Sequence, residues 1–132
     1  MGTRSLTYVY SEDTPLINMY RQYDGYPTGH GAELAEFLNP FEMVKGIPAK
    51  KGGDQESKVA NGMGCLAAQL IANFKQSVGG FYIYAVTDTD CGQDYEYHVY
   101  ENHVVVKNPT KVIFEGDYQS FAEFCSDSVS VE

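Results

Sequence analysis

The sequence predicts an α+β fold in which an antiparallel sheet, made of an N-terminal hairpin and C-terminal strands, packs against one long helix and one or two short helices. Three observations predict it. Segments with the composition of β-strands cluster at both ends of the chain. A long stripe of apolar residues at helical spacing occupies the middle. The strands do not alternate with helices along the chain, as they do in a doubly wound parallel sheet.

The N-terminal elements follow from local composition. Residues 3–10 and 16–23 are rich in β-branched and aromatic side chains, and the polar turn between them contains a proline, so they predict a hairpin. Three glycines and a proline in residues 24–31 predict a loop. A short helix begins at Ala32 and stops at Asn39, because the residue before Pro40 avoids the α region.

The middle of the chain predicts a flexible loop and then the longest helix. The loop covers Lys45 to Asp54 and is rich in glycine and lysine. Asp54 or Ser57 can cap the helix, and Gly79 with Gly80 ends it, which gives some twenty residues and a length of about 30 Å. Its apolar stripe consists of Val59, Met63, Leu66, Ala67, Leu70, Ile71, Phe74 and Val78.

A second stripe on the same helix contains only small residues. It consists of Ala60, Gly64, Ala68 and Ala72, each four positions apart. Small residues in a row let another backbone approach closely. Two interpretations stay open, namely tight packing on the sheet within one chain and a seam between copies in a homo-oligomer.

The C-terminal part predicts four strands and a helix. Residues 81–87 and 95–101 flank an acidic turn and are expected to be neighbours, and two shorter strands follow at 103–107 and 112–115. Asp117 is a candidate N-cap for a short last helix, and Ser126 to Glu132 is expected to be a frayed tail.

Tyrosines crowd the first two of these strands. With a period of two, Tyr82 and Tyr84 share one face, whereas Phe81, Ile83 and Ala85 share the other. If the Phe81 side meets the helices, a tyrosine-rich face is left for a second subunit or a planar ligand. The alternative is that these tyrosines are solvated residues of high β-propensity.

Composition bounds the classes of function. A length of 132 residues predicts one domain spanning residues 1–132, and a net charge of −9 argues against direct binding to nucleic acid. The sequence contains no apolar stretch long enough to cross a bilayer and no secretory leader, so no membrane association is expected. Three widely spaced cysteines are an odd number, which favours a reducing, cytoplasmic location. The histidines and cysteines lack the spacing of a metal site, and no cofactor is expected.

The best candidate site is the glycine-rich segment that leads into the first short helix. Backbone N–H groups at such a junction are free to hold a phosphate or carboxylate, and our hypothesis depends on those of residues 29–32 pointing outward. The candidate ligand-binding residues in and beside this segment are Arg21, Tyr23, Tyr26, Gly29, His30 and Gly31. The arginine and the imidazole supply donors, and the tyrosines supply flat faces for a planar ring.

Three further cations complete this candidate site. Arg4 joins it if the hairpin register brings it near, and Lys50 and Lys51 would close over a phosphate from the flexible loop. These residues favour a non-enzymatic binding protein for a small anionic or nucleotide-like ligand. The alternative is that the segment is only a connection from strand to helix, which needs glycines for its φ angles and tyrosines to cover the core.

The N-terminal region carries a resemblance. The motif of residues 3–7 (TRSLT) together with residues 20–31 (YRQYDGYPTGHG) resembles an uncharacterised family of small phage and bacterial proteins, over roughly residues 1–40. The resemblance implies no activity and no site. It implies a phage or mobile-element origin, in which case a sensible ligand is a host signalling nucleotide that the protein sequesters as a counter-defence, in the host cytoplasm.

Two other functions remain open. An acidic inhibitor, or a nucleic-acid mimic, would occupy a cationic surface of a host protein, and the acidic turn at 88–94 with Glu96 favours it. A small hydrolase or transferase would use His30 oriented by Asp24, but no nucleophile or other catalytic residue is evident from the sequence.

Overall fold

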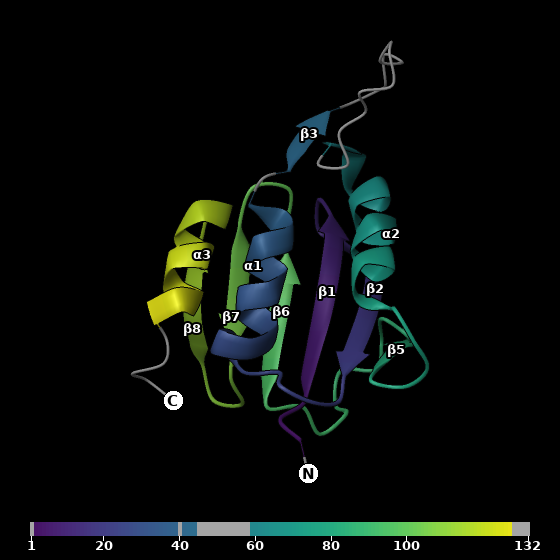
Figure 1. Cartoon of the computed structure of the whole chain (residues 1–132), viewed down its shortest axis with the longest axis vertical. Helices are drawn as coiled ribbons and strands as arrows, with labels where there is room; N and C mark the ends of the chain where they lie inside the picture. Colours follow the sequence, from purple (N-terminus) through teal and green to yellow (C-terminus); the bar gives the residue numbers. More distant parts are fainter. Residues whose placement is uncertain (1, 40, 45–58, 128–132) are drawn as a thin grey trace.

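The computed structural model describes residues 2–39, 41–44 and 59–127, and it has the predicted α+β architecture. A six-stranded sheet has the order β5-β2-β1-β6-β7-β8, and all three α-helices lie on one of its faces (Figure 1). Its strands are β1 (Ser5–Ser11), β2 (Thr14–Arg21), β5 (Phe81–Tyr84), β6 (Tyr95–Val99), β7 (Val104–Lys107) and β8 (Val112–Gly116). The helices are α1 (Ala32–Leu38), α2 (Gly62–Phe74) and α3 (Tyr118–Asp127). The predicted loop at 45–54 lies outside the described residues.

The N-terminal hairpin is confirmed, and it supplies the centre of the sheet. β1 and β2 are antiparallel from the Ser5–Arg21 pair to the Ser11–Thr14 pair, with an irregularity between Val9 and Tyr10. β1 pairs with β6 in parallel, whereas every other strand pair of this sheet is antiparallel. The C-terminal strands therefore join the hairpin from both sides.

The expectation that the first two C-terminal strands are neighbours is wrong. β5 pairs with β2 and β6 pairs with β1, so the whole hairpin lies between them. The acidic segment at 88–94 is consequently part of a crossing connection between two separated strands. This pairing is long-range, and local composition does not determine it.

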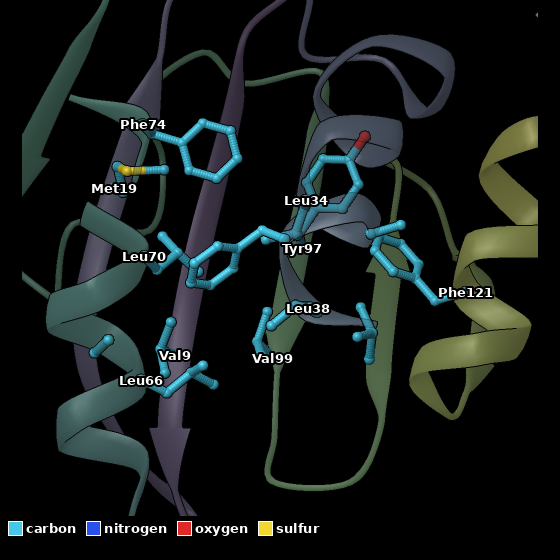
Figure 2. Close-up of a cluster of buried hydrophobic side chains, with 14 of the residues drawn as sticks. Val9, Met19, Leu34, Leu38, Leu66, Leu70, Phe74, Tyr97, Val99 and Phe121 are labelled. Atoms are coloured by element: carbon cyan, nitrogen blue, oxygen red, sulfur yellow. The ribbon is translucent and has the colours of Figure 1, made fainter. Parts of the chain in front are cut away.

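The core fills the space between the sheet and the helices. Buried side chains from β1, β2, β6 and β7 meet those of the three helices (Figure 2). Tyr97 and Phe121 are the largest of the fully buried side chains. The labelled core residues in Figure 2 are Val9, Met19, Leu34, Leu38, Leu66, Leu70, Phe74, Tyr97, Val99 and Phe121.

The longest helix is shorter than predicted. Val59–Asn61 forms strand β4, which pairs in parallel with β3 (Glu42–Val44) in a separate two-stranded sheet. α2 starts after it at Gly62, whose φ of 83° is open only to glycine at low cost. It has 13 residues and ends at Phe74, so Val78 is outside the helix and is 97% exposed.

The stripe of small residues is also corrected. Ala60 belongs to β4 and is buried, but Gly64, Ala68 and Ala72 lie on α2 and are exposed. A Cβ added at Gly64 would have nothing within 4 Å. Of the four residues only Ala60 packs within the chain, so the interpretation that the stripe as a whole does so is wrong, and a seam between copies stays a prediction.

The two short helices agree with the sequence. α1 begins at Ala32 and ends at Leu38, as the pattern predicts. At the start of α3 the Asp117 carboxylate accepts a hydrogen bond from the Ser120 amide at 2.8 Å, which confirms the cap. α3 continues to Asp127, so Ser126 and Asp127 belong to the helix and not to the predicted tail, whose residues 128–132 lie outside the described residues.

Candidate functional site

The glycine-rich segment folds into one compact turn instead of an open loop. Asp24 adopts a φ of 62°, and the buried Gly25 then donates its N–H to the Thr3 carbonyl at 2.9 Å. Residues Pro27–Gly31 form a π-helical turn that continues directly into α1. The backbone is therefore already helical where α1 begins.

The backbone amides of this turn are occupied, which contradicts the anion-binding hypothesis. The Gly29 N–H donates to the Tyr26 carbonyl at 2.9 Å, and the His30 N–H donates to the Asp24 carbonyl at 2.7 Å. The Gly31 N–H also bonds to the Tyr26 carbonyl, and the Ala32 N–H bonds to the Gly29 carbonyl. All four N–H groups that were expected to point outward have main-chain partners, because the π-helical turn folds the segment onto its own carbonyls.

The glycines of this turn provide space, not unusual φ angles. A Cβ at Gly29 would lie 2.5 Å from the Asp24 carbonyl oxygen. A Cβ at Gly31 would lie 2.8 Å from the Sγ of Cys125 on α3. Neither glycine has a positive φ. Close packing of the turn on itself and on α3 is the reason that these positions are glycine.

His30 is a core residue. Its side chain is fully buried, with Nε2 2.7 Å from the Thr7 hydroxyl and Nδ1 3.1 Å from Nη1 of Arg21. The arginine can only donate, so Nδ1 accepts, and the proton on Nε2 is donated to Thr7. Burial, and then the charge of Arg21, lower the pKa of His30 to about 3.

These contacts also contradict the hydrolase hypothesis. Asp24 contacts His30 through its carbonyl oxygen, which accepts the backbone N–H of the histidine. The Asp24 carboxylate instead accepts a hydrogen bond from the Tyr26 hydroxyl at 3.2 Å. An imidazole that is shielded from water and bonded at both nitrogens cannot take a proton from a substrate.

Arg21 is neutralised inside the fold. Its Nη1 lies 2.7 Å from the Glu33 carboxylate, and its guanidinium lies 4.9 Å from the centre of the Phe81 ring. The side chain is 12% exposed, at the wall of a surface cavity of about 420 Å³ that Glu33 and Glu36 also line. Two carboxylates beside one arginine disfavour an anionic ligand there.

Arg4 does not join Arg21 in one site. Arg4 lies on the opposite side of the sheet, where its backbone N–H donates to the Asp94 carboxylate and its guanidinium reaches Gly92. Tyr23 is 57% exposed. The flap residues Lys50 and Lys51 lie outside the described residues.

The opposite face of the sheet, which none of the described helices covers, carries a row of aromatic rings. We call it the helix-free face. Tyr8 stacks on His98 at 4.9 Å, Tyr10 stacks on Tyr100 at 4.4 Å, and Tyr100 stacks on His103 at 4.5 Å between ring centres. Tyr8 and His98 are buried, and the other three rings are half-buried.

Tyrosines of β5 and β2 extend the helix-free face to the sheet edge. Tyr84 stacks on Tyr20 at 5.0 Å, and Tyr82, which is 44% exposed, lies beyond. Phe81 packs against the core on the helix side. The predicted alternation on this strand is therefore confirmed, but Tyr95 and Tyr97 on β6 point to the helices instead.

A hydrogen-bonded chain of side chains runs through the aromatic row. The Tyr10 hydroxyl is 2.6 Å from Nδ1 of His98, and Nε2 of His98 is 2.9 Å from the Glu96 carboxylate. The bond to His98 lowers the pKa of Glu96, and burial raises that of Tyr10. These two bonds hold Tyr10, His98 and Glu96 in fixed positions on the helix-free face.

The sequence contains a signal for part of this series of hydrogen-bonded side chains. The signal is missed when each histidine is considered alone. Glu96 and His98 are two positions apart on one strand, so both side chains must lie on the same face. The third member, Tyr10, comes from a distant strand, and its position depends on the pairing of β1 with β6.

The connection between β5 and β6 adds carboxylates to the helix-free face. Its backbone is attached to the sheet at Asp88, whose carbonyl accepts bonds from the Tyr8 hydroxyl and from the Asn18 amide. A groove of about 520 Å³ separates the connection from the β7–β8 turn. The charged residues that line it are Asp90, Asp94, Glu96, Lys107 and Lys111.

Among the residues that the structure describes, no cluster of side chains could hold a metal ion, and no helix is long and apolar enough to cross a membrane. No family model, curated protein or solved structure matches the chain.

Proposed function

We propose that the protein is a non-enzymatic binding protein that covers a cationic surface of another protein with its helix-free face. One observation carries the proposal: tyrosines, imidazoles and carboxylates gather on the only face of the sheet that no described helix covers. Tyrosine is enriched at protein interfaces because a rigid ring buries much area at low entropic cost.

Charge supports a cationic partner. The chain carries a net charge of −9, so a cationic protein surface is attracted from a distance and a polyanion is repelled. Glu115 on β8 pairs with Val105 on β7 and stands on the helix-free face, beyond the acidic groove. Carboxylates thus stand beside the aromatic row, at the groove and on β8.

The small-anion function loses its support in the same geometry. The amides of residues 29–32 have internal partners, His30 is buried, and Arg21 is paired with Glu33. Sequestration of a host nucleotide is therefore not the function that the site supports best. The setting in a phage, with a host protein as partner, rests on the N-terminal resemblance alone.

A matched pair of variants tests the proposal. Glu115→Lys reverses a charge on the helix-free face, and Glu123→Lys makes the same change at an exposed position of α3. Both variants would serve as bait in bacterial lysate at low and high salt, with the captured proteins quantified by mass spectrometry. We expect Glu115→Lys to lose the partner and Glu123→Lys to retain it, and high salt to weaken capture by the wild type.

Two results would contradict the proposal. Equal loss of the captured partner in both variants would mean that binding depends on the net charge and not on the helix-free face. Stabilisation of the protein by a nucleotide in a thermal-shift panel, abolished in Arg21→Ala, would restore the small-anion function despite the geometry.

A further inference from the structure

The free edge of β5 is a second surface with open hydrogen-bonding capacity. Among the described strands, β5 is the last on its side of the sheet and pairs only with β2. The Gln22 N–H bonds to the Gly80 carbonyl, so the groups of alternate residues 80, 82 and 84 face β2. The N–H and carbonyl groups of Phe81 and Ile83 therefore point away from the sheet. Such an edge is a template for another strand.

Lys75, which follows α2, covers half of this edge. Its ammonium donates to the Phe81 carbonyl at 2.8 Å and to the Gly79 carbonyl at 3.1 Å. The Phe81 N–H in turn bonds to the Gly79 carbonyl at 2.8 Å. Both outward groups of Phe81 are thus engaged, and only those of Ile83 are left for an incoming strand.

The surroundings of the edge are apolar. Val78, Ile83 and Tyr82 are 97%, 54% and 44% exposed, and the ammonium of Lys75 lies 5.5 Å from the centre of the Tyr82 ring. The strand sequence, Phe-Tyr-Ile-Tyr, contains no charged residue. Among the described residues 75–84, Lys75 is therefore the only charged residue.

We propose that Lys75 closes the β5 edge to strand addition, and that without its ammonium a second copy of this chain pairs there. A two-fold arrangement would place Ile83 opposite Ile83 of the other copy, which pairs the remaining N–H and carbonyl groups and buries the exposed apolar side chains. In the wild type the Lys75 ammonium of each copy occupies the Phe81 carbonyl, so that carbonyl is lost to the pairing.

Lys75→Met tests this directly, because it keeps an unbranched side chain and removes the charge. Self-association would be measured by sedimentation equilibrium in 0.3 M salt, where the long-range repulsion between acidic chains is screened to about 6 Å. We expect the dimer dissociation constant to fall at least about tenfold relative to the wild type. Lys111→Met, an equal charge change at an exposed position of the β7–β8 turn, should leave it unchanged.

A second substitution locates the interface. Ile83→Pro removes the outward N–H, and an edge strand tolerates proline at such a position. In the Lys75→Met background it should restore the association of the wild type. The proposal is overturned if folded Lys75→Met associates like the wild type, or if its dimer persists with Ile83→Pro. Lys75→Gln gives the same comparison should the methionine variant fail to fold, with circular dichroism as the check.

Discussion

The buried imidazole of His30 makes the stability of the fold depend on pH in a calculable way. In the folded chain the pKa of His30 is lowered to about 3, whereas an unfolded chain has the ordinary value of 6.5. Between these two values the unfolded state binds a proton that the folded state excludes. This group therefore costs stability progressively as the pH falls below about 6.5, and it has no effect above that value.

The magnitude follows from the two pKa values. In the unfolded chain at pH 5, the protonated form of His30 outnumbers the neutral form about 30-fold, whereas the folded His30 stays neutral. This difference lowers the free energy of unfolding by about 2 kcal/mol relative to pH 8. A domain of this size has a total stability of about 5–15 kcal/mol. One buried ring should thus remove a measurable fraction of it.

Urea unfolding followed by circular dichroism at pH 5 and pH 8 measures this loss. His30→Gln is the control, because glutamine keeps a donor for Thr7 and an acceptor for Arg21 but does not titrate. We expect the wild type to lose about 2 kcal/mol more than this variant between the two pH values. All other titrating groups are common to both proteins and cancel in the difference.

Two outcomes would refute the reasoning. Equal losses of stability in the wild type and in His30→Gln would show that His30 binds a proton equally in both states. A resonance of the folded His30 ring that titrates with a midpoint near 6.5 would show that the ring is reached by water.

The packing of the π-helical turn leads to two further predictions. Gly31→Ala should lower the free energy of unfolding in urea by about 1–3 kcal/mol, because its Cβ would meet the Cys125 sulfur at 2.8 Å. Gly64→Ala is the control: its Cβ would have nothing within 4 Å, so it should raise the free energy of unfolding by about 0.5–1 kcal/mol. Equal effects of the two substitutions would contradict this account. Tyr97→Phe removes the buried bond of its hydroxyl to the Gly25 carbonyl at 2.7 Å and should lower the free energy of unfolding by about 1–3 kcal/mol, so an unchanged value would mean that this bond contributes nothing.

Local patterns predicted the elements that depend on local interactions. The hairpin, α1, the Asp117 cap and the two faces of β5 follow from strand composition, proline chemistry, a short-range hydrogen bond and a period of two. Each of these signals concerns residues that are close in sequence, so a single sequence contains them in full.

The errors arose where distant segments decide the structure. The apolar stripe continues through Val59, but pairing with β3 recruits this residue into a strand and delays α2 to Gly62. The order of the strands separates β5 from β6 although they follow each other in sequence. Likewise, a glycine-rich helix start is open to anions only if no carbonyl folds back on it, and here those of Asp24 and Tyr26 do.

The two faces of the sheet use their polar side chains differently, and this difference supports the proposed function. On the helix side, Thr7, His30 and Arg21 bond to one another and to Glu33, so their hydrogen-bonding groups serve the fold. On the helix-free face the Glu96–His98–Tyr10 chain keeps aromatic rings in place beside an acidic groove. Fixing polar groups on a partly exposed surface reduces the entropy that a partner must offset on binding. This prior ordering supports the proposed recognition role of the helix-free face.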